Sequence, residues 1–196
     1  MFDILRSYFE TKNKLTDDQF EFMQTLFIPR KMKKGEFLQR EGEIAKYGAF
    51  VTKGCLRSYV MDTKGKEHIV QFAPENWWIS DTESMANPLS HSRYFIDAIE
   101  NSEVLLIDLA SQEKLMETIP EFAIQYRQGI QKRNAAKDKR IVSSLSATAE
   151  ERYQEFLKKY STIAQRIPQH MLASYLGISP ETLSRIRKQM SSKKII

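Results

Sequence analysis

The stretch that decides the fold of the C-terminal region reads QHMLASYLGISPETLSRIRK and runs from Gln169 to Lys188. Ala173 is small where two crossing helices would approach most closely, and Gly177 can adopt the positive φ that a tight turn between them requires. Ser179 is a favourable N-cap and Pro180 a favourable first helical residue, so a second helix has a defined start. The apolar residues that would seal the two helices are Leu172, Leu176, Ile178, Leu183 and Ile186. The stretch therefore predicts a helix-turn-helix.

The outward face of the second helix predicts contact with double-stranded DNA. Residues at the N-terminal end of a recognition helix reach base edges in the major groove. Arg185 can donate two hydrogen bonds to a guanine, and Glu181 can accept one from a cytosine amino group. Contacts with phosphates are predicted for Gln169, His170, Ser179, Thr182, Arg187 and Lys188. The competing interpretation is an ordinary helical hairpin with a polar outer face, which does not require Ala, Gly and Ser-Pro in this order.

The distribution of charge agrees with a nucleic-acid-binding module at the C-terminal end. The chain has 196 residues and a net charge of +5. Residues 148–196 carry nine Lys or Arg against four Glu, whereas the first 147 residues carry 21 charges of each sign. A neutral body joined to a basic module suits a sensor that carries a polyanion-binding domain. A basic solvated surface would give the same balance, so the motif and not the charge carries the prediction.

Upstream of this module, residues 31–108 have the pattern of an antiparallel β-barrel. Short β-type runs alternate with turn signals such as Asp62-Thr63-Lys64-Gly65, and their close spacing favours a sandwich or jelly-roll barrel over a parallel sheet. Ahead of them, Thr16 and Gln19 form a capping box that predicts a helix ended by Pro29. The predicted strands are Glu36–Gln39, Ala49–Val51, Leu56–Met61, His68–Phe72, Tyr94–Ile99 and Val104–Ile107.

A long helix is predicted from Glu121 to about Leu145, because the apolar period changes to that of a helix after Leu109. Apolar positions near one face predict pairing with its twin in a homodimer, namely Phe122, Tyr126, Ile130, Ile141 and Leu145. A solvated connector helix is the alternative, because the centre of the helix is highly charged. The sequence thus predicts an α+β chain of three parts: a jelly-roll barrel sensor with N-terminal helices over residues 1–120, a dimerisation helix over 121–147 and a helix-turn-helix domain over 148–196.

Composition argues against several other classes of protein. No uncharged apolar run approaches the roughly 20 residues needed to cross a bilayer, and there is no signal-peptide pattern, so a soluble cytoplasmic protein is expected. The lone Cys55 cannot form an internal disulfide, and His68, His91 and His170 are isolated, so no metal or other cofactor is predicted. A cupin-type enzyme is the rival from another class, but no catalytic motif is present and we expect no enzymatic activity. A second rival is an effector-binding or partner-binding barrel that does not bind DNA.

These residues resemble the Crp/Fnr family of bacterial transcription regulators over nearly the whole chain. ISPETLSRIRK at 178–188 is similar to the family's recognition helix, in which a Glu-Thr pair precedes a Ser-Arg pair. KKGEFLQREGE at 33–43 and FVTKGCLRSYVMDTKGKEHIVQF at 50–72 are similar to the early strands of its cyclic-nucleotide-binding domain. The resemblance implies Glu181 and Arg185 as the base-reading residues, dimerisation through the long helix and contact with RNA polymerase. Pro180 stands where many members have an Arg, which implies an altered half-site.

Two further departures from the family pattern concern the wing and the nucleotide cassette. The chain ends at Ile196, so the β-hairpin wing of the family's winged helix is expected to be truncated. The family uses a Gly-Glu pair for the ribose and an Arg-Ser or Arg-Thr pair for the cyclic phosphate. Here Ser80 and Asp81 stand at the first pair, and Ser92 and Arg93 stand near the second. The resemblance therefore implies an effector that is not cyclic AMP and whose identity is unknown.

The predicted effector pocket comprises Trp78, Ser80, Asp81, Ser92 and Arg93, although filling of the barrel core is the alternative for Trp77 and Trp78. An effector in the barrel would change how the long helices of two protomers pack. That change would set the spacing of the two recognition helices on an inverted repeat, whose half-sites lie about 34 Å apart.

Overall fold

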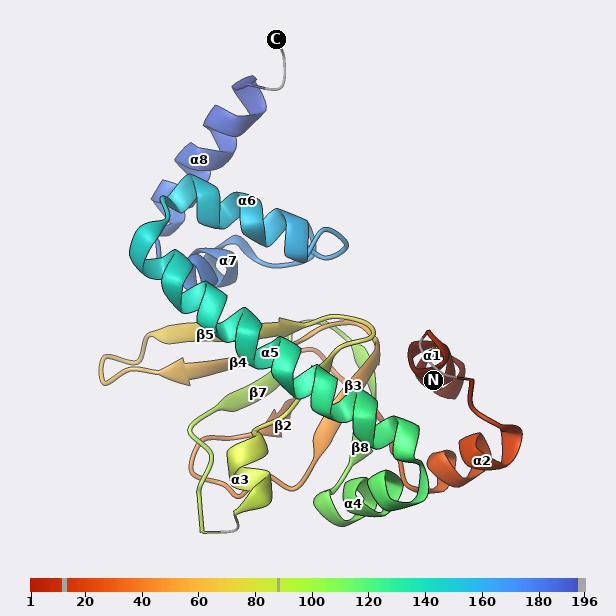
Figure 1. Ribbon diagram of the computed structural model, residues 1–196. Coiled ribbons are helices and arrows are strands. Elements are labelled where there is room, and N and C mark those ends of the chain that lie inside the picture. Colours follow the sequence, from red (N-terminus) through yellow and green to blue (C-terminus); the bar gives the residue numbers. More distant parts are fainter. Residues whose placement is uncertain (12–13, 88, 194–196) are drawn as a thin grey trace. The chain divides into compact units, whose positions relative to one another are not determined.

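Two four-stranded sheets form the β-structure of the chain (Figure 1). One sheet has the order β1-β8-β3-β6 and contains β1 (Ile28–Met32), β8 (Ser102–Ile107), β3 (Gly48–Lys53) and β6 (Trp78–Ile79). The other has the order β2-β7-β4-β5 and contains β2 (Phe37–Gln39), β7 (Phe95–Ala98), β4 (Leu56–Met61) and β5 (Glu67–Ala73). The computed structural model describes residues 1–11, 14–87 and 89–193. All six predicted strands are confirmed, and the register of β3 on β8 and of β4 on β7 is antiparallel.

The sequence-based reading missed β1 and β6, and it placed the end of the N-terminal helix wrongly. That helix, α2 (Asp17–Thr25), ends before Leu26, and Pro29 lies within β1. Pro29 removes a backbone donor, and the burial of β1 does not alternate along the strand, so no period of two marks it. β6 is only two residues long and falls below the length at which a pattern can be read.

β3 and β8 are nearly continuous apolar runs in the sequence because side chains on both faces of these strands are buried. Ala49 and Val51 of β3 and Leu106 of β8 belong to the core between the two sheets. Phe50 and Leu105, which point to the opposite face, belong to a second cluster made with helices. Both faces of these central strands are therefore buried, as expected for a sheet covered on two sides.

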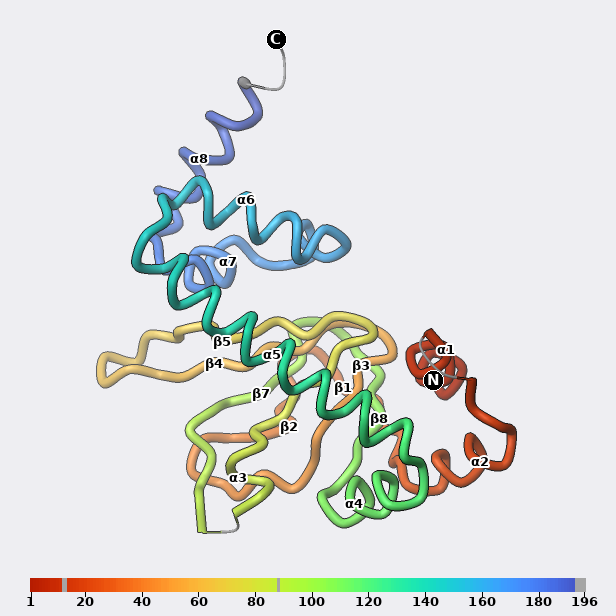
Figure 2. Tube along the Cα trace, in the orientation of Figure 1, coloured from red at the N-terminus to blue at the C-terminus, as the bar shows by residue number. Residues whose placement is uncertain are grey.

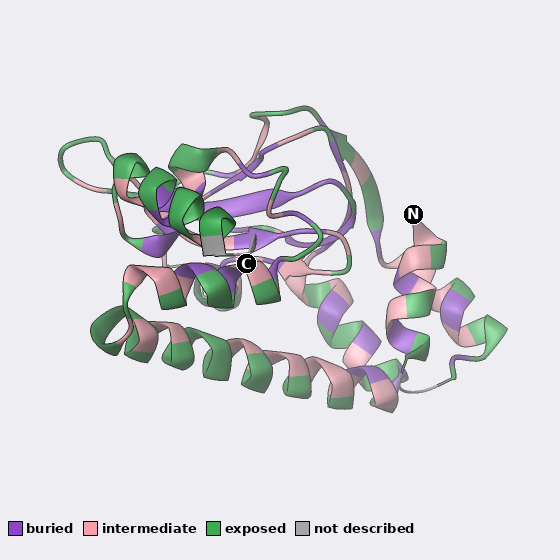
Figure 3. Ribbon diagram, turned by 90° about the horizontal axis from the view of Figure 1, so that it is seen from above, coloured by how far each residue is buried: buried purple, intermediate pink, exposed green. Residues whose placement is uncertain are grey.

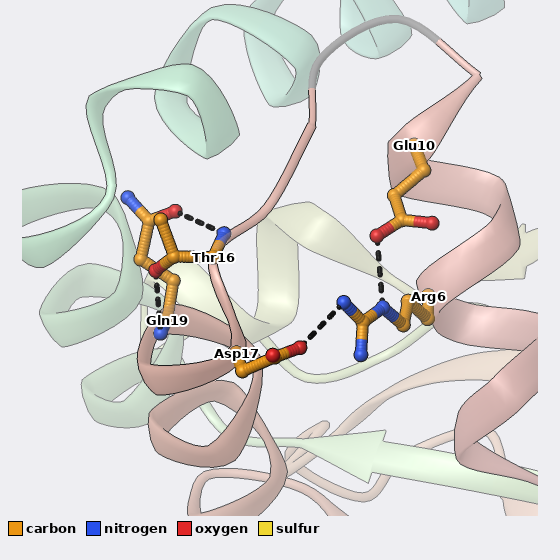
Figure 4. Close-up of polar contacts among 5 residues, drawn as sticks. All are labelled: Arg6, Glu10, Thr16, Asp17 and Gln19. Atoms are coloured by element: carbon orange, nitrogen blue, oxygen red, sulfur yellow. Dashed lines mark hydrogen bonds and ion pairs between the residues drawn. The ribbon is translucent and has the colours of Figure 1, made fainter.

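Four helices supply the second cluster: α1 (Phe2–Glu10), α2, α4 (Leu109–Thr118) and the first turns of α5 (Pro120–Ser146). The predicted capping box is confirmed, since the Gln19 N–H donates to Thr16 Oγ1 at 3.2 Å and the Thr16 N–H donates to Gln19 Oε1 at 3.0 Å (Figure 4). Arg6 ties α1 to α2 by donating to Asp17 at 2.8 Å, and it also donates to Glu10 of its own helix at 2.8 Å (Figure 4). These ion pairs are solvent-exposed, so the buried apolar side chains carry most of the packing energy.

The chain divides into two compact units. The first comprises Met1–Val60 and Val70–Ile130, and it also holds the short helix α3 (Thr82–Ala86). The second comprises Met61–Ile69, which is the turn between β4 and β5, together with Gln131–Ile196. Its helices are the later part of α5, α6 (Ala149–Lys159), α7 (Gln169–Leu176) and α8 (Pro180–Lys193). The three-part division predicted from the sequence therefore omits the segment at 61–69 from its helix-turn-helix part.

The start of the long helix α5 packs within the first unit. Phe122 is 4% exposed, and the partly buried Tyr126 packs against the same helical cluster, while the pairing of α5 with a second copy stays a prediction. The apolar surface of Phe122 and Tyr126 is buried, fully or partly, within the first unit. Figure 3 shows exposed positions recurring along α5. The exposed large apolar residues of this helix are Ile124, Ile141, Val142 and Leu145.

Candidate nucleic-acid interface

The predicted helix-turn-helix is present as α7, a tight turn and α8, which can be followed along the trace in Figure 2. Gly177 has φ +67°, in the left-handed region that the turn requires. The Ile178 N–H donates to Ala173 O and the Gly177 N–H to Ser174 O, each at 3.1 Å, which satisfies carbonyls at the end of α7. α8 continues to Lys193, beyond the predicted end of the motif at Lys188, and the predicted truncated wing falls on residues 194–196, outside the described residues.

A buried apolar seam holds the two helices together. Leu172, Ala173 and Leu176 of α7 are buried, as are Leu183 and Ile186 of α8. The supporting layer comes from α6, whose start is set by a second capping box between Thr148 and Glu151. Buried aromatic residues from α6, its C-cap and α7 pack at ring-centroid distances of 4.9 to 5.8 Å, namely Phe156, Tyr160 and Tyr175.

The start of α8 is defined as the sequence predicted. Ser179 Oγ accepts from the Thr182 N–H at 3.2 Å and lies 3.2 Å from the Thr182 hydroxyl, so both side chains serve the cap. Hydrogen bonds from the Ser179 side chain and from its own backbone N–H lower the pKa of Glu181. Its carboxylate therefore stays charged and remains a hydrogen-bond acceptor at neutral pH.

The polar face of α8 is open to solvent. Glu181 and Arg185 are both exposed and lie four residues apart, on one side of the helix. Arg187 and Lys188 are exposed as well, and Thr182 is half-buried. This exposure is the geometric condition for a recognition helix, because buried side chains could not reach base edges.

The N-terminus of α7 presents a second polar surface. Gln169 and His170 are exposed, and Pro168, which precedes the helix, makes no side-chain hydrogen bond to cap it. The first backbone N–H groups of α7 therefore donate no hydrogen bond to the side chain of the N-cap residue. Such a terminus suits a phosphate group.

Sequence reasoning missed a set of contacts between α7 and the β4–β5 turn. Ser174 Oγ donates to Glu67 O at 2.7 Å and accepts from the Ile69 N–H at 3.1 Å. Arg140 of α5 donates to Ile69 O at 2.9 Å and to Tyr175 O at 2.8 Å, and its guanidinium lies 3.9 Å from the centre of the Tyr175 ring. No local sequence signal marks these contacts, because their partners are as many as 107 residues apart.

Trp78 is the first of the five residues in the predicted effector pocket. Trp78 packs in the helical cluster, with ring-centroid distances of 5.1 Å to Phe50 and 6.1 Å to Phe27. These contacts agree with the alternative role of Trp78 as a core residue, and its place in an effector pocket stays a prediction. Trp77 packs against the core between the sheets, which agrees with its alternative role as a core residue.

The remaining cassette residues have mainly structural partners. Asp81 is buried and caps α3 by accepting from the Ser84 N–H at 3.2 Å. Ser92 is buried; its N–H donates to Glu43 O and its hydroxyl accepts from the Tyr94 N–H. Ser80 is half-buried and Arg93 is exposed. Arg57, which is buried, is engaged by Asp97 at 2.7 and 3.0 Å and is not free to bind an anion.

In residues 1–11, 14–87 and 89–193, no three His, Cys, Asp or Glu side chains cluster as metal ligands. Over the same residues, no helix has the length and apolar character needed to span a membrane.

Comparison with known proteins supplies a family model and two curated relatives. The model of the cyclic nucleotide-binding domain matches residues 29–119. The transcriptional activator protein Anr of Pseudomonas aeruginosa is 27% identical over 181 residues, which cover 85% of this chain and 72% of that protein. The transcriptional activator protein FnrA of Stutzerimonas stutzeri is 28% identical over 171 residues, which cover 80% of this chain and 68% of that protein.

Solved structures share the fold at lower identity. FixK2 from Bradyrhizobium japonicum has a TM-score of 0.72 at 22% identity, with 86% of each chain covered. The c-di-GMP responsive global regulator CLP of Xanthomonas campestris has a TM-score of 0.68 at 12% identity, with 91% of this chain and 93% of that chain covered. These solved structures therefore share the fold of the chain.

Proposed function

We propose that the chain is a DNA-binding transcription regulator of the Crp/Fnr type and not an enzyme, and that α8 reads a specific operator in the major groove. The observation that carries the proposal is the exposure of Glu181 and Arg185 on one side of α8, directly after a well-formed N-cap. Arg185 would bind a guanine through two hydrogen bonds, and the charged Glu181 would accept from a cytosine amino group.

The phosphate contacts that we propose surround these two residues. Exposed Arg187 and Lys188 of α8 and exposed Gln169 and His170 of α7 supply polar groups on either side of the reading positions. Ser179 and Thr182 face the same end of α8, although their hydroxyls also serve its cap. Such contacts fix register and supply most of the salt-dependent affinity, whereas Glu181 and Arg185 supply the specificity.

We also propose that the protein acts as a homodimer on an inverted repeat. The support is the exposed apolar set Ile141, Val142 and Leu145 near the end of α5, which a second copy of α5 would cover. Two-fold symmetry would place two recognition helices on half-sites about 34 Å apart. In this scheme residues 1–120 form a sensor, 121–147 a dimerisation helix and 148–196 the DNA-binding part, and RNA polymerase is the partner through which transcription changes.

The effector that we propose is not cyclic AMP. Asp81 caps α3 with its carboxylate, and Arg93 points to solvent at the position expected for a phosphate-binding arginine. A barrel without a buried, unpaired arginine would lose the charge-assisted hydrogen bonds that hold a cyclic phosphate. Calorimetric titration with cyclic AMP is expected to give no binding, and saturable binding in the micromolar range would contradict this proposal.

Selection of binding sites from genomic DNA tests the proposed function. The purified protein is expected to recover a sequence with two-fold symmetry. Arg185→Ala should relax the preference at one base pair in each half-site and weaken binding by about 1–3 kcal/mol. The matched control Lys188→Ala removes a predicted phosphate contact, so it should weaken all sequences alike and lower the salt slope by about 1. An unchanged preference in Arg185→Ala would contradict the role of Arg185.

A further inference from the structure

The last turn of α7 lies directly before Gly177, where the chain turns into α8. The last four carbonyl groups of an α-helix have no partner within the helix and need donors from outside it. N–H groups of the turn donate to two of them, Ala173 O and Ser174 O, each at 3.1 Å. The other two, Tyr175 O and Leu176 O, accept from arginine side chains of α5 and α6.

Arg140 of α5 is the donor to Tyr175. Its Nη2 donates to Tyr175 O at 2.8 Å, and its guanidinium carbon lies 3.9 Å from the centre of the Tyr175 ring. Hydrogen bonds from a charged donor are stronger than neutral ones, and a cation is favoured at the C-terminal end of a helix. The last part of α5 is therefore attached to the end of α7 through both the backbone and the ring of one residue.

Arg152 of α6 is the donor to Leu176, and it also holds a second point of the backbone. Its Nε donates to Leu176 O at 3.1 Å, and its Nη1 donates to Ala147 O at 2.7 Å. Ala147 lies between the end of α5 and Thr148, the N-cap of α6. Because the guanidinium is planar and stiff, its two nitrogens hold the end of α7 against the junction of α5 with α6.

These two arginines, which we call the arginine clamp, lie beside the apolar set proposed for the dimer. Ile141 directly follows Arg140, and Leu145 lies two residues before Ala147; both apolar side chains are exposed. The clamp, the apolar set, α7 and α8 all belong to the second compact unit (Figure 1). Arg140 and Arg152 are themselves half-buried, so they lie within this unit rather than on an open basic surface. The clamp thus joins the proposed dimer surface to the helix that precedes the recognition helix.

We infer that Arg140 and Arg152 are positioning residues that fix which separation of half-sites the dimer accepts. This role rests on the proposed function, in which α8 reads each half-site and the end of α5 meets its twin. In a two-fold dimer, any displacement of α7 against α5 is repeated in the partner, so it changes the separation of the two recognition helices twice. The arginines supply no base preference, because they are bonded to backbone carbonyls of their own chain.

Operators with altered spacing test this role. One inserted or deleted base pair between the half-sites changes their separation by about 3.4 Å and their relative rotation by about 35°. The unmodified protein should prefer the selected separation, and Arg152→Ala should lower that preference, measured as a ratio of affinities, at least about fivefold. Arg140→Ala should change the ratio in the same direction. The base preference within each half-site should stay the same in both variants.

Two further variants separate positioning from a purely structural role. Arg152→Lys keeps the positive charge but has one nitrogen where Arg152 uses two, so it should fold and still lose spacing preference. It decides the test if Arg152→Ala does not fold. Lys158→Ala is the matched control, because it removes an exposed cation from the same helix and should leave the ratio unchanged. A loss of folded protein alone would lower the affinity for all operators alike and would not change the ratio.

The outcomes distinguish the positioning role from the proposed function. If Arg152→Lys and Arg140→Ala discriminate between spacings as sharply as the unmodified protein, the clamp has a structural role only and the positioning role is refuted. An unmodified protein that reads both half-sites but accepts all spacings equally would also refute it and would leave DNA recognition standing. A protein that selects no DNA sequence would refute the proposed function, and the positioning role with it.

Discussion

Gly177 takes a positive φ, and Ser179 and Thr16 cap the helices that follow them, so the roles of these three residues depend on the adjacent backbone. The place of Trp78 depends instead on Phe27 and Phe50, which reach it only through the tertiary fold. The residue scale therefore separates conformational roles, which can be read locally, from packing roles, which cannot.

Gly54 has both a positive φ and close tertiary neighbours, so a substitution there tests the two constraints together. Its φ is +87°, and a Cβ there would overlap Ser102 Oγ and lie 2.8 Å from Asn101 O. Gly54→Ala should lower the free energy of unfolding by about 3 kcal/mol, from left-handed strain and overpacking together. Gly35→Ala is the matched control, since Gly35 has φ +78° but a Cβ there would meet no other atom within 4 Å, and it should cost only about 1 kcal/mol. Denaturant unfolding measures both, and equal losses would show that the close approach is relieved by movement of β8.

At the scale of elements, the terminal signals and the periodicity located most helices and strands. Two capping boxes set the starts of α2 and α6, and the strand boundaries of β4 matched the prediction at both ends. The sequence pattern does not show which helix or strand each element contacts. β5 lies at the end of its sheet, so the backbone groups on its outer edge need partners from elsewhere, and at Glu67 and Ile69 these come from α7 and α5.

Removal of the Ser174 hydroxyl tests that element-scale contact. Ser174→Ala leaves the Ile69 N–H and Glu67 O without this partner and should lower stability by about 1–2 kcal/mol. Amide hydrogen exchange at Ile69 should accelerate, which reports the local loss directly. Ser161→Ala, at an exposed loop position, is the control and should leave this exchange rate as it was. Unchanged protection of Ile69 in Ser174→Ala would mean that another group replaces the hydroxyl.

At the scale of the whole molecule, α5 presents apolar area that its own chain leaves uncovered. Ile141 is 59% exposed, Val142 is 61% exposed and Leu145 is 83% exposed. Neighbouring apolar side chains in water favour association, and a second copy of the same helix offers a self-complementary surface.

Charge placed in this apolar set should separate the proposed dimer. Ile141→Glu/Leu145→Glu is expected to raise the dimer dissociation constant by at least about tenfold, which corresponds to about 1.4 kcal/mol, because carboxylates would be buried without partners. Sedimentation equilibrium measures the shift. Lys132→Glu changes charge at an exposed α5 position outside the apolar set and serves as the control. A double variant that keeps the dimer would place the interface elsewhere on the molecule.

The sequence by itself determined the helix-turn-helix, its cap, its turn and the alternating strands, because each depends on residues within a few positions of one another. The tertiary structure alone decided which face of α5 is buried, why Trp78 faces helices and how Ser174 reaches the β4–β5 turn. The physical reason is that burial and edge pairing are contacts between distant segments. Local pattern shows that an apolar or polar group needs a partner, and only the folded chain supplies that partner.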